Sequence, residues 1–444
     1  MQLCVVALLL LGCGGPAETS GALPQTKAQD VAFVNVNVVP MDSERVLTGQ
    51  TVLVRGEEIV QIGPAGKVKV PAGALRVDGR GKYLMPGLAE MHGHIPPPQA
   101  PKEFTEAVLF MYVANGVTTV RGMLGAPGQL ELRERANRGE LLSPTLYLAG
   151  PSFNGNSVNS PGQAAEMVRQ QKREGWDLLK VHPGLTREEY DAMARTAREE
   201  GIRFAGHVPA DVGLAHALAM GQETIDHVDG YVEHLGAEGA PLDETKLAEV
   251  VRLTKKSGAW IVPTMALWET LLGITSIEKL LSYPELKYMP AQQVQAWEKA
   301  HRARQSAPQF DRKKAEQTAA NRKRILKALY DGGVPVIFGT DAPQQFSVPG
   351  FSVRHEMASM LEAGMTPYQI ILTATKNAGE YHKNKARFGT VTAGSRADLI
   401  LVGGDPLKDL SNVGRRAGVM VRGRWLTEDE IQKRLASIAA NGKL

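Results

Sequence analysis

The sequence predicts an α/β protein with a (β/α)8 TIM-like barrel and a small β-sandwich domain built from both chain ends. Between residue 87 and about residue 383, short apolar strands alternate with helical stretches, which is typical of βα units around a parallel barrel. On both sides of this region, apolar residues recur with a period of two between glycine-containing turns. The length of 444 residues suits a large barrel with one small accessory domain.

The predicted sandwich takes residues 30–86 from the N-terminal part and residues 387–444, including a terminal helix, from the C-terminal part. Period-two patterning occurs in five short segments, namely residues 32–39, 50–55, 58–62, 398–402 and 418–423. Because the two ends of the chain share this patterning, we expect them to pair into one small β-sandwich.

The barrel is assigned to residues 87–386. Its eight candidate strands are residues 87–94, 117–121, 145–150, 177–182, 204–208, 224–228, 260–264 and 334–340. Thr186 and Glu189 have the spacing of a capping box, which predicts a helix over residues 186–200. The last two strands are separated by a long gap, so residues 266–333 are expected to be a helical insertion that forms a lid or rim over the barrel mouth.

The N-terminal residues 1–29 read as a lipoprotein signal peptide followed by a flexible tether. The apolar run of residues 5–11 is far below the ~20 residues of a membrane span. It ends in Leu10-Leu11-Gly12-Cys13, which resembles a bacterial lipobox, although the first three residues lack the expected Lys or Arg. We expect a lipoprotein of the bacterial cell envelope that faces the periplasm, with membrane contact only through a lipid on Cys13. A plain secretory signal cut elsewhere is the alternative.

The composition limits which groups can bind a metal and which partners the protein can bind. Both cysteines, Cys4 and Cys13, lie in the signal segment, so the folded part has no thiol and must bind any metal through N and O ligands. A net charge of +4 with 22% charged residues of mixed sign is that of an ordinary globular protein. The basic runs 312–314 and 322–324 are expected on a solvated helix face, which does not support nucleic-acid binding. The sequence is compatible with a homo-oligomer.

Side chains that can bind a metal gather at the predicted strand ends. His92 and His94 end the first strand, and because strand residues i and i+2 project to the same side, their imidazoles point together. Further metal-competent side chains end the fourth, fifth, sixth and eighth strands, namely Lys180, His207, His227 and Asp341. Active sites of such barrels lie at the carboxyl ends of the strands, so the sequence predicts a metal centre there.

This constellation, preceded by Pro86-Gly87, resembles the amidohydrolase superfamily, in particular its binuclear subgroup with a carbamylated lysine, the prolidase-like and imidazolonepropionase-like enzymes. The resemblance extends from about residue 32 to residue 425. It implies two divalent metal ions, zinc being the first choice, with manganese or cobalt also fitting. One ion would be held by His92, His94, Lys180 and Asp341, and the other by Lys180, His207 and His227.

The resemblance also implies roles for two residues. Lys180 would carry a carbon dioxide-derived carbamate that bridges the ions, since burial favours the neutral amine that can add carbon dioxide. A surface lysine or a buried ion pair is the alternative reading of Lys180. Asp341 would act as general base and then general acid on the metal-bridging hydroxide, which is the implied nucleophile.

Substrate contacts are less defined. Tyr231 follows the sixth strand, where prolidase-like relatives carry a tyrosine that binds the substrate carboxylate; simple packing is the alternative. His182 lies two residues after Lys180 and could share its face, or belong only to a loop. Trp268 has two equal interpretations, a pocket wall or a core residue. Asn154 and Asn156 are candidates for a polar contact from the loop after the third strand. The remaining helical and polar-region histidines are assigned to the surface, namely His216, His301, His355 and His382.

The resulting function is a metal-dependent hydrolase that cleaves a C–N bond of a small amide or peptide, with a prolidase-like dipeptidase as one form. Dipeptide specificity does not follow directly, because the Gly-Gly-His of prolidase-like members is absent and Gly122 stands where they carry an aspartate. Two alternatives remain: a lactone or phosphoester hydrolase on the same site, and a non-catalytic metal-binding envelope lipoprotein. A deaminase is disfavoured by the bridging lysine.

Overall fold

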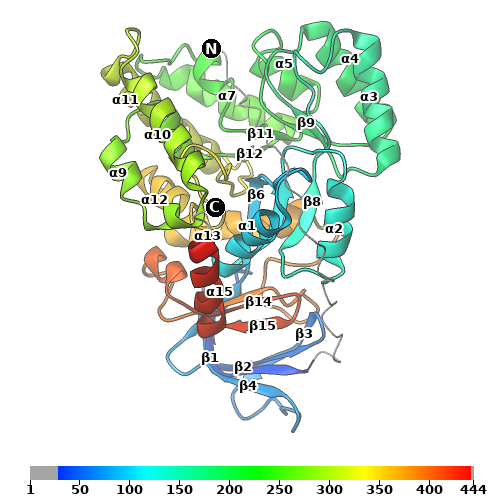
Figure 1. Ribbon diagram of the computed structural model, residues 1–444, viewed down its shortest axis with the longest axis vertical. Coiled ribbons are helices and arrows are strands. Elements are labelled where there is room, and N and C mark those ends of the chain that lie inside the picture. The colour runs from blue at the N-terminus through cyan, green and yellow to red at the C-terminus, as the bar shows by residue number, and fades with distance from the viewer. Residues whose placement is uncertain (1–28, 442–444) are drawn as a thin grey trace.

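The computed structural model describes residues 29–441, so the expected signal peptide and Cys13 lie outside the described part. The described chain has two parts, seen one above the other in Figure 1. A β-sheet built from both chain ends lies below, and parallel strands surrounded by helices lie above. No helix of the described residues is long and apolar enough to cross a membrane.

The lower part is an eight-stranded sheet with the order β15-β14-β13-β5-β1-β2-β3, and β4 pairs with β1. Its strands are β1 (Val31–Val38), β2 (Leu47–Arg55), β3 (Glu58–Pro64), β4 (Leu75–Asp78), β5 (Tyr83–Pro86), β13 (Leu399–Val402), β14 (Arg416–Val421) and β15 (Arg424–Thr427). The antiparallel pair of β5 with β13 joins the two chain ends. The predicted pairing of the terminal segments is therefore confirmed.

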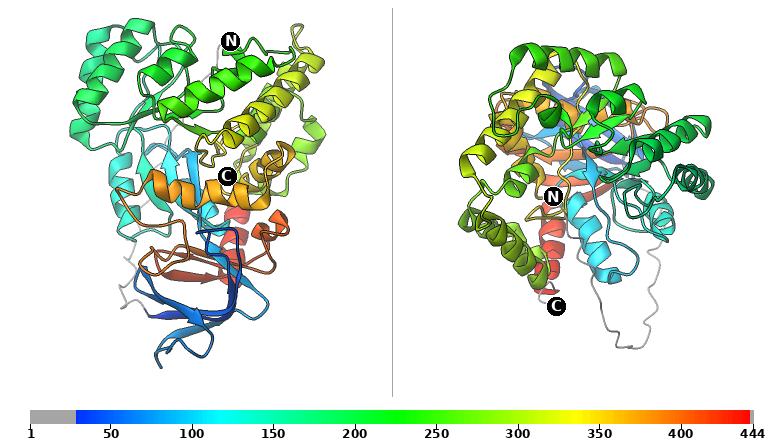
Figure 2. Two further views of the ribbon diagram at one scale, coloured as in Figure 1. Left: turned by 180° about the vertical axis from the view of Figure 1, so that it is seen from behind. Right: turned by 90° about the horizontal axis from the view of Figure 1, so that it is seen from above.

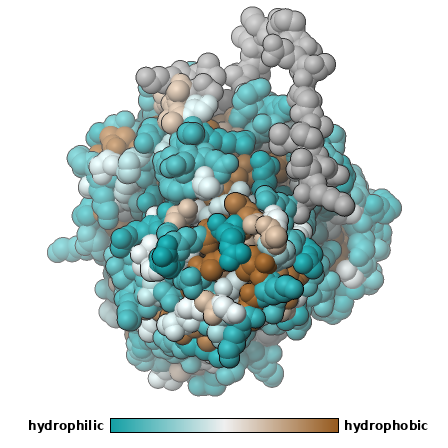
Figure 3. All heavy atoms as spheres, turned by 90° about the horizontal axis from the view of Figure 1, so that it is seen from below, coloured by the Kyte–Doolittle hydropathy of each residue, from teal (hydrophilic) through white to brown (hydrophobic). Residues whose placement is uncertain are grey.

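This sheet curls over its own core. The ring of Phe33 in β1 meets the ring of Trp425 in β15 with centroids 5.1 Å apart, although four strand steps separate β1 from β15. Neighbouring strands lie about 4.8 Å apart, so a flat sheet could not bring these rings together. Figure 3 shows the end of the molecule that carries this sheet: apolar side chains are exposed near its centre, and polar side chains surround them.

The upper part contains seven parallel strands in two sheets, β6-β7-β8 and β9-β10-β11-β12. They are β6 (Leu88–Gly93), β7 (Val117–Gly122), β8 (Thr145–Leu148), β9 (Leu179–Val181), β10 (Phe204–Gly206), β11 (Thr224–Asp226) and β12 (Trp260–Val262). A parallel bridge between Ala149 and Leu178 connects the two sheets. Seven of the eight predicted strands are thus present, most of them shorter than expected.

The eighth predicted strand, residues 334–340, is not a regular strand; it makes a single bridge, from Val336 to Ile261. It still lies between β12 and β6, because the Ile337 N–H donates to Ile261 O and the Met91 N–H donates to Phe338 O. Other donors of the segment bond outside the neighbouring strands, such as the Phe338 N–H to Thr373 O. This mixed bonding explains why the strand is irregular.

The Glu90 carboxyl group connects β6 to this segment. Glu90 Oε1 accepts the N–H groups of His92 (3.0 Å) and Thr340 (2.8 Å), and Oε2 lies 2.6 Å from the Thr340 hydroxyl. Glu90 is fully buried, and burial raises its pKa to about 8, so its protonated form resembles glutamine.

We therefore expect Glu90→Ala to lower the free energy of unfolding by about 3 kcal/mol, because buried N–H groups left unpaired cost about 1–3 kcal/mol each. Glu90→Gln can keep all three contacts and is expected to cost less than about 1 kcal/mol. Denaturant unfolding of both variants measures the difference. Equal destabilisation by the two changes would contradict this role for Glu90.

Helices cover the parallel strands on the outside, as both views of Figure 2 show. The α-helices of the described residues are α1 (Lys102–Ala114), α2 (Gln129–Asn137), α3 (Pro161–Glu174), α4 (Arg187–Glu199), α5 (Leu214–Ala219), α6 (Tyr231–His234), α7 (Glu244–Ser257), α8 (Met265–Leu271), α9 (Ile277–Leu281), α10 (Ala291–Gln305), α11 (Arg312–Asp331), α12 (Val353–Glu362), α13 (Pro367–Ala374), α14 (Lys376–Tyr381) and α15 (Glu428–Asn441). Of these, α15 packs on β14 and β15 of the lower sheet. The predicted capping box of Thr186 and Glu189 is confirmed at the start of α4.

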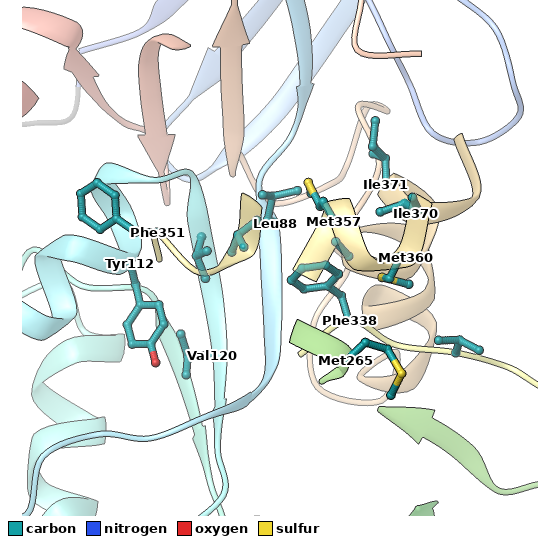
Figure 4. Packing of buried hydrophobic residues seen from close by; sticks show 14 of the residues in the cluster. Leu88, Tyr112, Val120, Met265, Phe338, Phe351, Met357, Met360, Ile370 and Ile371 are labelled. Atoms are coloured by element: carbon teal, nitrogen blue, oxygen red, sulfur yellow. The ribbon is translucent and has the colours of Figure 1, made fainter. Parts of the chain in front are cut away.

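The long gap before the eighth strand segment contains helices α9, α10 and α11, as the sequence predicts. The main core links both parts of the fold. In Figure 4, Leu88 of β6 and Phe338 lie among Met357 and Met360 of α12 and Ile370 of α13, all of which are buried. The main core thus fixes β6, β11 and the eighth segment, whereas β9 and β10, which carry Lys180 and lead to His207, pack in a second apolar cluster with α3 and α4.

Candidate metal centre

The six predicted ligands all lie at or just beyond the carboxyl ends of the parallel strands. His92 lies in β6 and Lys180 in β9. His207 directly follows β10 and His227 directly follows β11. Asp341 follows the irregular eighth segment, where its N–H donates to His92 O.

The Asp341 carboxylate lies among three of the imidazoles. Its Oδ1 is 2.6 Å from His94 Nε2 and 3.7 Å from His92 Nε2, and its Oδ2 is 3.8 Å from His227 Nε2. Ligand atoms of His92, His94 and Asp341 all lie within 4.8 Å of one another. This spacing suits a set of side chains that share one cation.

The second predicted group adjoins the first. The ring centroid of His227 lies 4.4 Å from that of His92 and 4.5 Å from that of His207. Lys180 Nζ lies 3.1 Å from His92 Nε2, at the centre of the group. Lys180 is fully buried, and no carboxylate of the described residues lies within 4.0 Å of its amine. Burial is the main reason that the pKa of Lys180 falls to about 8, so a larger fraction of the amine is neutral than in an ordinary lysine.

Three of the histidines are oriented in the same way by partners on their Nδ1 atoms. His92 Nδ1 lies 2.7 Å from Asp226 Oδ2, and His207 Nδ1 lies 2.6 Å from Asp229 Oδ2. His227 Nδ1 lies 2.8 Å from the Thr264 hydroxyl oxygen. An oxygen partner on Nδ1 fixes the tautomer that presents the Nε2 lone pair, which is the usual arrangement of metal-binding histidines.

The Nε2 atom of His227 is a direct indication that the site fits a cation. It is buried and has no hydrogen-bond partner among the described residues. Burial is the main reason that the pKa values of His92 and His227 lie well below the ordinary value, so both rings are neutral. Neutral, oriented and unpaired imidazole nitrogens can bind a divalent ion.

The backbone around the site is strained. His227, Thr264 and Asp341 have positive φ angles of 66°, 49° and 62°. Such angles are unfavourable for residues other than glycine and cluster at functional sites, where the surrounding structure compensates for them. The strain aims the three side chains at one another.

Sequence reasoning missed the partners that orient the ligands. Asp226 accepts from Thr224 Oγ1 at 2.5 Å and lies 3.4 Å from Arg121 Nη2. Arg121 is fully buried and donates its Nε to Met91 O at 2.6 Å. Arg121 lies in β7, as the predicted strand 117–121 implies, but its place inside the parallel strands next to Asp226 was not predicted. The one feature of the sequence that could have indicated this role of Asp226 is its position next to the candidate ligand His227.

The predicted substrate contacts have mixed outcomes. Tyr231 is fully buried in the main core and its hydroxyl pairs with Thr254 Oγ1 at 2.8 Å, so the expected substrate role is replaced by packing. His182 stacks on His207 with centroids 5.0 Å apart, so it does adjoin the site. Asn154 bonds within its own loop, where its Oδ1 accepts the N–H groups of Asn156 and Ser157. Trp268 packs under the guanidinium of Arg322 at 3.7 Å.

Thr264 allows a specific test. Thr264→Val keeps the β-branched shape but removes the oxygen beside His227 Nδ1, so we expect metal affinity to fall by about 10–100-fold. Competition with a chelator measures this affinity. Thr270→Val in α8 is the matched control, because its hydroxyl only contacts Ala266 O within the same helix. Equal metal affinity in the two variants would show that Thr264 does not orient His227.

Fold and site together define an α/β protein whose parallel strands end in a candidate metal centre of histidines, a lysine and an aspartate. The sequence pattern of the amidohydrolase family matches residues 83–426. This chain therefore belongs to the amidohydrolase family, and the resemblance predicted from the sequence is confirmed.

Several known proteins are similar to the chain. Adenine deaminase 3 of Rhizobium meliloti (strain 1021) is 25% identical over 422 residues, which are 90% of this chain and 58% of the deaminase. The chain thus spans less than two thirds of that relative's length. A solved Xaa-Pro dipeptidase with bound methionine aligns with a TM-score of 0.68 and 22% identity over 90% of this chain and 100% of its own. Bottromycin amidohydrolase aligns with a TM-score of 0.74 and 21% identity over 94% and 91% of the two chains. These structures show the fold.

Proposed function

We propose that this protein is a metal-dependent hydrolase that cleaves a C–N bond of a small amide or peptide. The observation that carries the proposal is the shared orientation of His92, His207 and His227, whose Nδ1 atoms all have oxygen partners. The Nε2 atoms of His92 and His227 lie 3.7 Å and 3.8 Å from the Asp341 carboxylate. Membership of the amidohydrolase family supports hydrolysis of C–N bonds as the reaction class.

The proposal includes a closed eight-stranded barrel. The bridges from Ala149 to Leu178 and from Ile261 to Val336 connect the strands in sequence order. The hydrogen bond of the Met91 N–H with Phe338 O brings the last segment back to β6. In a closed barrel the six candidate ligands converge on one mouth, which is where barrel enzymes place their chemistry.

The residues would hold two divalent ions in the sets predicted above, with zinc the first choice. Bound ions would supply an activated water nucleophile and polarise the scissile carbonyl. Lys180 would bridge the two ions only as a carbamate, because an ammonium group is no ligand and a neutral amine has a single lone pair, whereas a carbamate offers two oxygens. Its complete burial and lack of a nearby carboxylate among the described residues support this conversion over a buried ion pair.

Asp341 is the proposed proton carrier. Its carboxylate is nearly buried and lies against three imidazoles, so a proton it accepts stays within the site rather than passing to solvent. The same carboxyl can then return the proton to the leaving nitrogen. His182, which stacks on His207, would contact a substrate beside this group.

The substrate class is tested by one experiment. Purified protein is analysed for metal content and screened with dipeptides, N-acyl amino acids, lactones, phosphoesters and adenine. Two ions per chain and turnover of an amide or peptide are expected. Turnover confined to lactones or phosphoesters would favour the second candidate, since an activated water attacks any polarised electrophile. Adenine turnover would match the function named for the curated relative. Bound metal without turnover of any substrate would favour a binding protein.

The location in the cell envelope is a separate proposal, based on the lipobox-like Leu10-Leu11-Gly12-Cys13. Cys13→Ser should remove the site of lipidation and move the protein from the membrane fraction to the soluble envelope fraction. Fractionation followed by immunoblotting measures the change. Membrane association that persists in Cys13→Ser would reject the lipobox.

A further inference from the structure

A buried arginine of the helical insertion lies against the candidate metal centre. Arg322 belongs to α11, which packs against α6, α7 and α8, and the residue is 3% exposed. An apolar side chain would be enough to dock the helix at this position, so a buried charge needs another explanation. Most other buried residues of α11 are indeed apolar, namely Ala315, Ala319, Ile325, Leu326 and Leu329.

The first contact of Arg322 is with the backbone of a candidate ligand. Its Nη1 donates to the carbonyl oxygen of His227, which has no other hydrogen-bond donor among the described residues. His227 and Val228 both have positive φ angles, of 66° and 56°. Such angles are costly for residues other than glycine, above all for a β-branched one, and persist only where neighbouring groups enforce them. The guanidinium thus holds the His227 backbone in the conformation that places its ring beside Asp341.

The second contact is electrostatic and leads to another candidate ligand. Arg322 Nη2 lies 4.0 Å from Asp229 Oδ1, and the other oxygen of this carboxylate, Oδ2, lies 2.6 Å from His207 Nδ1. Asp229 is the one carboxylate of the described residues within 4.0 Å of the guanidinium. Because Arg322 is buried, water screens this attraction only weakly. The positive charge therefore stabilises the carboxylate in the place where it orients His207.

The guanidinium is itself fixed by a third contact. Its Cζ lies 3.7 Å from the centroid of the Trp268 ring in α8, and such stacking on aromatic rings is typical of arginine. The same helix begins directly after Thr264, whose hydroxyl lies beside His227 Nδ1. Arg322 Nε is buried and has no hydrogen-bond partner among the described residues, which makes this position costly for stability. A cost of this kind is expected where a side chain serves a functional site.

We propose that Arg322 is a positioning residue of the candidate metal centre, which fixes His227 through its carbonyl oxygen and His207 through Asp229. These two histidines belong to the second of the two proposed ligand sets, so affinity for the second ion depends on a side chain of the insertion. The effect on metal binding rests on the proposed two-ion centre, whereas the orientation of His227 can be measured without any ion.

Metal binding by two variants tests the proposal. Arg322→Met has a similar length but neither charge nor donor, so we expect affinity for the second ion to fall by about 10–100-fold. Competition with a chelator measures this affinity, and metal analysis should then find one ion per chain where the wild type keeps two. Arg322→Lys keeps the charge and a donor and should recover part of the affinity. It should still bind the second ion more weakly than the wild type, because an ammonium group lacks the fork that contacts His227 O and Asp229 together.

Asn321→Ala is the matched control for the packing of α11. Asn321 is buried in the same helix and donates to Ala237 O and Ala240 O, both at 2.7 Å, in the loop between α6 and α7. Its loss should lower the free energy of unfolding, while both ions bind as in the wild type. Equal loss of metal in Asn321→Ala and Arg322→Met would assign the effect to docking of the helix and overturn the proposal. If Arg322→Met does not fold, wild-type affinity in Arg322→Lys would overturn it.

Nitrogen NMR of the full-length protein after removal of metal tests the orientation itself. With isotopically labelled histidine, the ring nitrogens report the tautomer, and the signals of His227 are those missing from His227→Gln. The wild type and Asn321→Ala should show one tautomer of His227 with the proton on Nδ1, which faces the Thr264 hydroxyl. Arg322→Met should show a mixture of tautomers. A wild type that binds fewer than two ions would overturn the proposed two-ion centre, whereas unchanged His227 signals in Arg322→Met, or a mixture already in the wild type, would overturn the positioning role.

Discussion

Asp341→Asn should lower kcat by about 10²–10⁴-fold while the bound metal changes little, because a general base typically contributes this much to the rate. Asparagine keeps the size of the side chain and one oxygen that can face His92 and His94. It removes the group that can accept and return a proton. Because the Asp341 carboxylate lies beside three imidazoles, the substitution removes the proton-accepting group from the middle of the candidate metal centre.

The measurement combines steady-state kinetics on the best substrate from the screen with metal analysis of the same sample. Asp331→Asn, an exposed carboxylate at the end of α11, is the matched control and should behave like the wild type. If Asp341→Asn retained turnover within a factor of a few, another group would carry the proton. His182 would then be the first candidate, since it stacks on His207.

The candidate ligands could be predicted because each depends on a local feature of the sequence. His92 and His94 are two residues apart at the end of one strand, Lys180 lies in a short apolar strand, and the other three directly follow apolar segments. Strand geometry alone then brings them to one end of the parallel strands. The pairing of the two chain ends could also be predicted, because segments at both ends show period-two patterning, although β5, which makes the contact with β13, was not among them.

The side chains that orient the ligands could not be predicted, because their roles depend on contacts across several strands. Arg121 comes from β7 and Asp226 from β11, and only the folded strands bring them together beneath His92. The Thr264 hydroxyl lies beside His227 Nδ1, and Thr264 has a left-handed backbone conformation that the sequence does not predict. The same applies to Glu90, whose carboxyl bonds to the backbone of a segment 250 residues away.

Residue type also misled the prediction in places where burial decides the role. The basic run 322–324 looks like a solvated helix face, yet Arg322 is 3% exposed and donates to His227 O while it covers Trp268. His301 and His382 are buried as well, although polar neighbours in the sequence suggested the surface. The composition of a helical segment does not show that one of its charged side chains is buried on the inner face, because the neighbouring charged side chains are exposed.

Lys180→Ala should lose most of its bound metal and activity, because it removes the only candidate bridge between the two proposed ligand sets. Removing a residue that merely supports a ligand typically costs 10–100-fold in metal affinity, so loss of a bridging ligand should cost at least about 100-fold. Lys256→Ala, an exposed position in α7, is the control for a lysine change without contact to the site.

The carbamate itself can be separated from a simple packing role of Lys180. In the wild type, isotopically labelled bicarbonate should give a carbamate signal in carbon NMR that disappears in Lys180→Ala. Short carboxylic acids should restore part of the activity of Lys180→Ala, because a free carboxylate can occupy the space of the missing bridge between two cations. A fully active Lys180→Ala protein with two bound ions would show that the ions need no bridge from this residue. Burial of the Lys180 amine beside His92 Nε2 would then serve only to fix the ring of His92.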